Sequence, residues 1–115
     1  MKRIIAQIRN EITQVIRNRL TLVPPPVLAK ISKAPHTVEV RLTASVARLS
    51  IVPGHLTEVY AFNGQVPGPT LDVHEGDHVI VHYTNDLPEP STVHWHGIHL
   101  PADMDGSPMY PVAPG

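Results

Sequence analysis

Proline does most to limit what this chain can fold into. It accounts for 13 of the 115 residues, roughly twice its usual share of a protein. Because proline has no backbone N–H and clashes with the preceding helical turn, few helices tolerate such a density. We therefore expect mostly strands and loops, and a length of 115 residues is enough for one small core rather than two.

Cysteine and histidine usage narrows the available chemistry. The sequence contains no cysteine, which excludes disulfides, thiolate nucleophiles and metal sites with cysteine ligands. It contains eight histidines, a large number for so short a chain. We expect any chemistry of this protein to depend on imidazole groups.

The charges divide the chain into two parts. Residues 1–33 carry seven Lys and Arg side chains and a single acidic residue, whereas residues 34–115 carry two Arg against nine Asp and Glu. Such an asymmetry marks physically different segments. We interpret residues 1–33 as a basic amphipathic helix with a proline-rich linker, and residues 37–115 as the folded domain.

The basic segment has apolar residues at three- to four-residue spacing, which predicts an amphipathic N-terminal helix of about four turns. The helix ends before the prolines at 24–26, and its apolar runs are far shorter than the ~20 residues of a membrane span. Contact of residues 1–20 with an anionic membrane surface, a targeting role, docking on a partner and no specific role all remain open. No nucleic-acid partner is expected, because aromatic residues are not interleaved with the basic ones. The apolar positions are Ile4, Ile5, Ile8, Ile12, Val15, Ile16 and Leu20.

From Thr37 onward the apolar period changes from 3.6 to 2, as in half-buried strands. Turn dipeptides such as Pro53-Gly54 and Asn63-Gly64 separate the strand-like stretches. About five short strands with turns between them are typical of an all-β sandwich or barrel. The expected strands cover residues 38–46, 57–62, 70–74, 78–83 and 92–98.

Two groups of histidines carry little functional signal. Residues His74 to His78 match the H-E-x-x-H zinc-protease pattern, but that pattern works only on a helix. Here Gly76-Asp77 predicts a turn, so we reject a protease. His78 and His82 share the outer face of one expected strand, where we expect solvated side chains.

The sequence His94-Trp95-His96-Gly97 is more informative. On a strand, residues i and i+2 point the same way with side chains roughly 6–7 Å apart. That spacing presents one imidazole to each of two neighbouring metal ions, and neutral imidazole is a good ligand for copper. Gly97 lets a ligand or another backbone segment approach closely.

From about Leu42 to Gly115 the chain resembles the start of the first cupredoxin (plastocyanin-like) domain of multicopper oxidases, the laccase-like family. The resemblance extends over several motifs in the same order and at the same spacing. They are Phe62 to Leu71, Glu75 to Val81, Asn85 to Pro88, Thr92 to Gly97, Asp103 to Pro108 and Val112 to Gly115.

The resemblance implies a cupredoxin-like Greek-key sandwich, incomplete here, and a role for three residues. His94 corresponds to a ligand of the type 2 copper and His96 to a ligand of one type 3 copper. Asp105 corresponds to a carboxylate that delivers protons during the reduction of dioxygen, which suits a carboxylate near metal-bound water; otherwise it is a turn residue before Gly106. His99 matches no ligand position of the family.

The chain also departs from the family pattern. A complete oxidase needs four H-x-H motifs and a type 1 copper held by a cysteine thiolate, whereas this sequence has one such motif and no cysteine. We expect an N-terminal fragment that does not turn over alone, whose partners are copper ions, dioxygen in the complete enzyme and the missing downstream cupredoxin domains. The alternative is a small copper-binding or oligomerising module that uses His94 and His96.

A histidine-dependent hydrolase has no nucleophile context in this sequence. The substrate and the compartment cannot be read from it either. The family is usually exported or periplasmic, but the basic segment lacks the continuous apolar stretch of a signal peptide.

Overall fold

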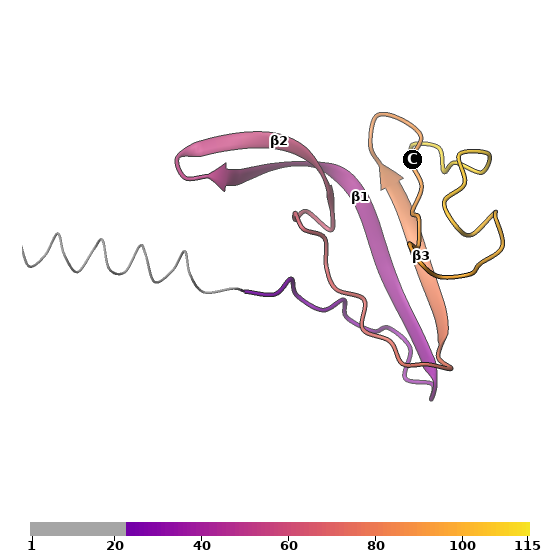
Figure 1. Ribbon diagram of the computed structural model, residues 1–115. Coiled ribbons are helices and arrows are strands. Elements are labelled where there is room, and N and C mark those ends of the chain that lie inside the picture. Colours follow the sequence, from indigo (N-terminus) through magenta and orange to yellow (C-terminus); the bar gives the residue numbers. More distant parts are fainter. Residues whose placement is uncertain (1–22) are drawn as a thin grey trace, which may run out of the picture.

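The computed structural model describes residues 23–115, and the amphipathic helix predicted within residues 1–33, with the membrane contact left open for residues 1–20, lies outside this range. Three strands are present in it: β1 (Thr37–Val52), β2 (His55–Phe62) and β3 (His78–Asp86) (Figure 1). Residues 23–115 contain no helix, and therefore none that could cross a membrane. The expectation of an all-β chain is confirmed for this part.

The long strand β1 organises the sheet, whose strand order is β2-β1-β3. Its first half, Thr37 to Ser45, pairs in parallel with β3. Its second half, Ala44 to Val52, pairs in antiparallel with β2, and the register shifts between Leu49 and Val52. β1 and β2 therefore form a hairpin that projects from the β1–β3 ribbon (Figure 1).

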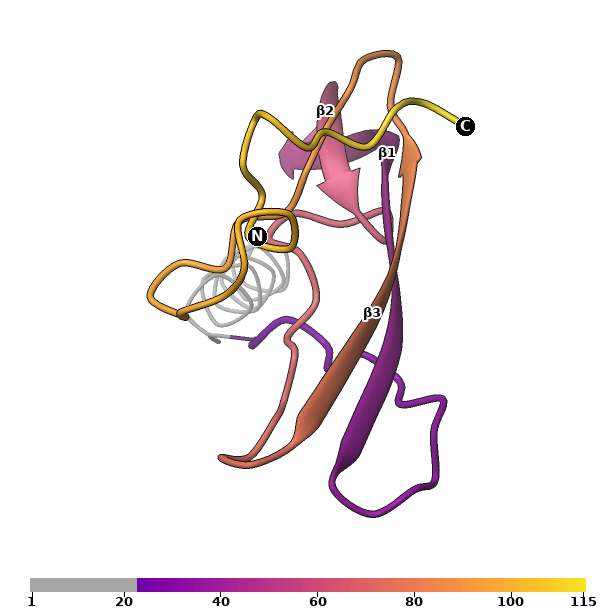
Figure 2. The same cartoon turned by 90° about the vertical axis from the view of Figure 1, so that its right-hand side faces the viewer.

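The period-2 pattern of β1 separates two faces of the β1–β3 ribbon. Val38, Val40, Leu42 and Ala44 are buried, while Arg41 between them is exposed. Alternate residues of a strand point to opposite faces, so one face carries the core and the other is polar. The segments that follow β2 and β3 lie to the same side of this ribbon in Figure 2.

The Asn63-Gly64 turn ends the hairpin as predicted. Both residues have positive φ, 50° and 74°, as a type I′ turn requires. The Asn63 side chain also reaches β1, where its Oδ1 accepts a hydrogen bond from the Thr43 N–H at 2.7 Å and its Nδ2 donates to the Arg41 carbonyl at 3.3 Å. The turn is thereby attached to the part of β1 that comes just before the stretch paired with β2.

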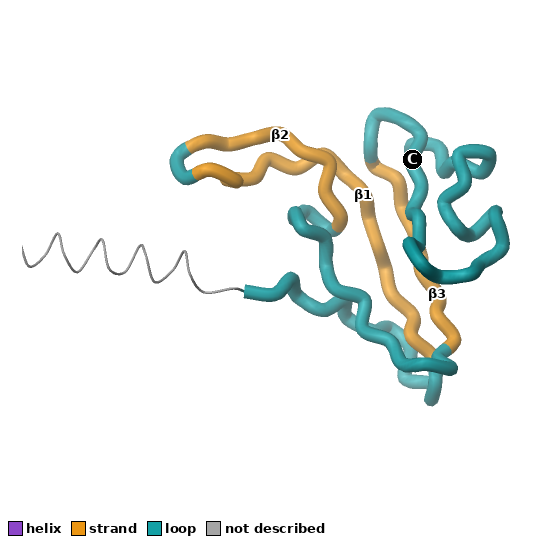
Figure 3. Tube along the Cα trace, viewed as in Figure 1, coloured by secondary structure: helices purple, strands orange, loops and turns teal. Residues whose placement is uncertain are grey.

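Two predicted strands are wrong: residues 70–74 and 92–98 are loops (Figure 3). The sheet therefore has three strands in the described part of the chain, not about five. Thr70 makes only an isolated bridge to Val27, through hydrogen bonds of its N–H with Pro26 and of its carbonyl with Leu28. Strand-like composition does not suffice where no neighbouring strand offers a ladder of partners.

The end of β3 is attached to the end of the chain through Asn85, which is 2% exposed. Its Nδ2 donates to the carbonyls of Glu89 and Val112, each at 2.9 Å, and its Oδ1 accepts from the Leu87 N–H at 3.1 Å. Ser91 and Val112 also exchange backbone hydrogen bonds. These contacts hold the segment around residues 92–112 beside β3.

Candidate metal centre

Residues His94 to His96 lie in the loop after β3, just beyond the Ser91–Val112 bridge. The two histidine side chains are exposed and Trp95 between them is half-buried. The ring centroids of His94 and His96 are 5.8 Å apart, and the two ring planes are tilted by 42°. The structure thus brings the predicted histidine pair together, although on a loop rather than on a strand.

Asp105 is the second component of this site, because its backbone carbonyl lies 2.9 Å from His94 Nδ1. A carbonyl oxygen only accepts hydrogen bonds, so Nδ1 carries the proton. In the neutral ring Nε2 then keeps its lone pair and is free to bind a metal ion. The main chain of Asp105 therefore determines which nitrogen of His94 is the available donor.

The Asp105 carboxylate lies at the same place. Its Oδ1 is 3.3 Å from His94 Nδ1 and accepts a hydrogen bond from the Trp95 backbone N–H at 3.3 Å. The side chain is 27% exposed, compared with 60% for His94. The three residues predicted for the site, His94, His96 and Asp105, thus form one cluster.

Gly106 allows this close approach, and sequence reasoning identified it only as the residue after a turn. It has a φ of +72°, and a Cβ placed on it would lie 2.4 Å from the Val93 carbonyl oxygen. Any other residue would push the Asp105 loop away from the histidine segment. The Asp-Gly dipeptide indicated a turn at this position, but it could not show that Gly106 lies against Val93, thirteen residues earlier.

The donor set suits copper. Neutral imidazole is a ligand for copper and other late transition metals, and two imidazoles whose rings are 5.8 Å apart can each face a different ion. Within residues 23–115 no group of three or more His, Asp or Glu side chains is arranged to hold a metal ion. A copper ion with more than two ligands would take the others from outside these residues.

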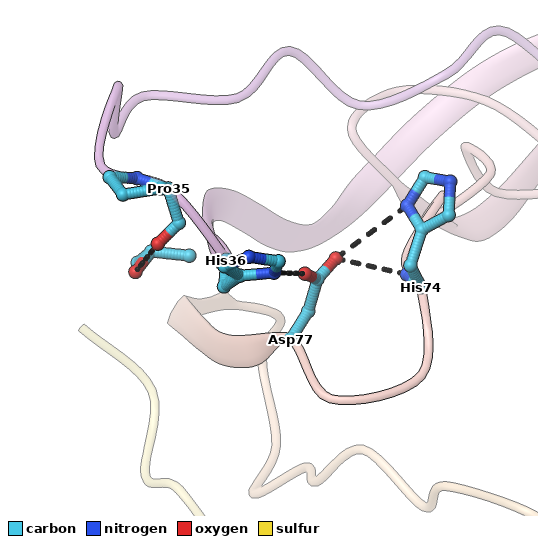
Figure 4. Close-up of polar contacts among 5 residues, drawn as sticks. Pro35, His36, His74 and Asp77 are labelled. Atoms are coloured by element: carbon cyan, nitrogen blue, oxygen red, sulfur yellow. Dashed lines mark hydrogen bonds and ion pairs between the residues drawn. The ribbon is translucent and has the colours of Figure 1, made fainter.

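The His74–His78 stretch is not a metalloprotease site. It forms a turn before β3, closed by the Asp77 N–H, which donates to the His74 carbonyl at 3.1 Å. Asp77 Oδ2 accepts from the His74 N–H at 2.9 Å, and the imidazoles of His36 and His74 each lie 3.7 Å from one carboxylate oxygen (Figure 4). The backbone N–H of His74, and then the nearby imidazoles and Lys30, lower the pKa of Asp77 below its usual value.

Two other histidines lie away from both of these clusters. His82 on β3 is exposed, as expected, and its Nε2 lies 2.7 Å from the Glu39 carboxylate on β1, across the polar face of the sheet. His99 is exposed in the stretch that follows Gly97.

Comparisons with known proteins agree on one family. The family model described as "Multicopper oxidase" matches residues 44–115, more than half of the chain. Laccase-6 of Oryza sativa subsp. japonica is 41% identical over 98 residues, which are 77% of this chain and 17% of the laccase. A multicopper oxidase of Staphylococcus aureus is 34% identical over 74 residues, which are 64% of this chain and 17% of that protein.

Solved structures give the same result. The multicopper oxidase from Campylobacter jejuni, described as a metallo-oxidase, superposes with a TM-score of 0.77 at 36% identity, covering 82% of this chain and 20% of that one. The laccase from Pediococcus acidilactici Pa5930 superposes with a TM-score of 0.72 at 33% identity, covering 81% and 20%. This chain therefore spans about a fifth or less of each of these four proteins.

Proposed function

This chain belongs to the multicopper oxidase family, and we propose that it supplies one pair of copper ligands to the trinuclear cluster of a laccase-like oxidase. In this proposal His94 holds the type 2 copper through Nε2, and His96 holds one of the paired type 3 coppers. The observation that carries it is the histidine pair itself, with ring centroids 5.8 Å apart and His94 Nδ1 occupied by the Asp105 carbonyl. When bound, the copper ions supply the reduction of dioxygen to water with electrons taken from a substrate.

Asp105 contributes in two ways within this proposal. Its carbonyl accepts the hydrogen bond of the ring nitrogen that does not bind the metal and so orients the His94 ring, as is usual for metal-binding histidines. Its carboxylate, 27% exposed and 3.3 Å from His94 Nδ1, lies on the side of the ring away from Nε2, where in this proposal it holds a proton and passes it on. The chain thus offers both a donor pair and a proton carrier.

The rest of the cluster belongs to other parts of a larger protein in this proposal. The sequence has no cysteine for a type 1 copper and one H-x-H motif, and the described residues hold no three-ligand group. The remainder of this first cupredoxin domain would supply its second H-x-H motif and the strands that complete the sandwich started by β1, β2 and β3. A later cupredoxin domain would supply the other histidines and the type 1 site.

The test is the copper content of the native protein that contains this chain. We expect wild-type protein to bind several copper ions per polypeptide, and His94→Ala and His96→Ala each to lose copper. His82→Gln and His99→Gln are the controls, since these histidines lie outside the ring pair, and both should retain the wild-type content.

Two results would change the proposal. Native protein without copper, or with equal loss in all four variants, would contradict it. A discrete oligomer of the 12.6 kDa chain with copper bound through His94 would favour the copper-binding module instead.

A further inference from the structure

Trp95 separates the two histidines of the candidate centre, and its indole lies where the loop meets the sheet. It lines a small cavity of about 100 Å³ together with Val40 and Leu42 of β1. It also lines an open apolar groove of about 640 Å³ together with Val79 of β3. Trp95 therefore borders both spaces, whose walls include residues on the core face of the β1–β3 ribbon.

The backbone of Trp95 is attached on both sides. Its N–H donates to the Asp105 carboxylate at 3.3 Å, and its carbonyl accepts from the Ile98 N–H at 3.1 Å. The side chain is half-buried while both neighbouring histidines are exposed. Trp95 is thus held by the Asp105 loop through its amide and by the following turn through its carbonyl, while its half-buried side chain borders the two apolar spaces.

We infer that Trp95 is a positioning residue for the copper ligands, an inference that rests on the proposed function. With the indole inserted against the sheet, the residues before and after it must point outward, and their rings come to lie 5.8 Å apart. The same insertion keeps the His94 ring within 2.9 Å of the Asp105 carbonyl. Trp95 itself touches neither ion; it sets the separation of the imidazoles and the tautomer of His94.

Other residues that line the groove do not hold the histidine loop in the same way. Val79 borders the same groove and remains 38% exposed, but it lies on β3 and has no backbone link to the histidine loop. Shortening Val79 removes apolar contact from the groove and leaves the attachment of the loop intact. The variant Val79→Ala is therefore the matched control for the loss of apolar surface.

The first experiment uses the native copper-loaded protein, with wild type, Trp95→Phe, Trp95→Ala and Val79→Ala. Removing residues that orient metal ligands weakens metal binding by roughly 10–100-fold, and we expect this loss for Trp95→Ala. The EPR hyperfine pattern of the copper at His94 should change with it. Trp95→Phe, which still fills much of the space, should retain the wild-type copper affinity and EPR pattern. Val79→Ala should match wild type in both.

The second experiment is independent of copper. In metal-free protein, 15N NMR of the His94 ring reports the proton position. We expect the Nδ1–H tautomer in wild type, Trp95→Phe and Val79→Ala, and a mixture of tautomers in Trp95→Ala.

The outcomes separate this inference from the proposed function. Wild-type copper affinity, EPR pattern and tautomer in Trp95→Ala would overturn the positioning role, as would the same losses in Val79→Ala. Protein without copper at His94, but with the tautomer shift in Trp95→Ala, would contradict the proposed function and leave the positioning role in place.

Discussion

The substitution Gly106→Ala tests how the Asp105 loop is held against the histidines. The added Cβ would lie 2.4 Å from the Val93 carbonyl oxygen and 2.7 Å from the His94 nitrogen, whereas real Cβ atoms stay at least 3.0 Å from their neighbours. The contacts are to backbone, so no flexible side chain can move aside. The loop has to retreat by about 0.6 Å to reach the shortest contact that real Cβ atoms make, and by about 1 Å to restore ordinary contact.

That retreat acts on the hydrogen bonds between the two segments. It would stretch the 2.9 Å contact of His94 with the Asp105 carbonyl and the 3.3 Å contact of Trp95 with the carboxylate towards or beyond the limit of a hydrogen bond. Each bond contributes about 1 kcal/mol, and alanine at a φ of +72° adds about 1–2 kcal/mol. We therefore expect a loss of about 3–4 kcal/mol in the free energy of unfolding.

Gly54→Ala is the matched control, because Gly54 has a φ of +81° and nothing within 4 Å of the added Cβ. It should cost only about 1–2 kcal/mol. Urea unfolding gives both free energies, and copper content gives the effect on the site. Equal losses in the two variants, or wild-type copper content in Gly106→Ala, would refute the reasoning about the loop.

Three further predictions concern the scaffold. Asn85→Ala removes the three hydrogen bonds of this buried side chain, to the carbonyls of Glu89 and Val112 and from the Leu87 N–H, so we expect a loss of about 3 kcal/mol in urea unfolding; wild-type stability would contradict the role of Asn85. Asn63→Gly keeps the positive φ but loses the two side-chain hydrogen bonds to β1, so we expect the free energy of unfolding to fall by about 1–2 kcal/mol. An unchanged urea midpoint would contradict this role of the Asn63 side chain. The pKa of Asp77 lies below its usual 3.8, so its charge stabilises the fold above about pH 4 and this contribution fades as the pH falls through the lowered pKa. Thermal unfolding midpoints of wild type and Asp77→Asn should therefore differ at neutral pH and converge at acidic pH; a constant difference would contradict this.

The first half of β1, which the sequence predicted correctly, has one buried face. Val38 and Val40 on β1 are buried and Arg41 beside them is exposed, and this alternation is local information. The Asn63-Gly64 turn is equally local, since two successive residues with positive φ are favoured by these residue types.

The predictions that failed depend on partners far away in the sequence. Residues 92–98 have strand-like composition, but the Ser91–Val112 bridge is isolated and no ladder continues from it. The long β1 was predicted only to Val46, because its extension to Val52 depends on pairing with β2.

The features of the candidate site also divide into those that the local sequence predicts and those that depend on distant segments. The spacing of His94 and His96 was enough to predict that their rings lie together. The resemblance to the family suggested Asp105 only as a proton carrier, and its contact with His94 runs mainly through a backbone carbonyl, an atom that every residue has. The loop approach at Gly106 and the insertion of Trp95 required the three-dimensional structure.

The most direct test of the central claim is a crystal structure of the native copper-loaded protein, with anomalous diffraction measured at the copper edge. We predict one copper peak bonded to His94 Nε2 and a separate peak bonded to His96, with His94 Nδ1 still on the Asp105 carbonyl. A single copper shared by both imidazoles, or copper peaks away from both of them, would contradict the account.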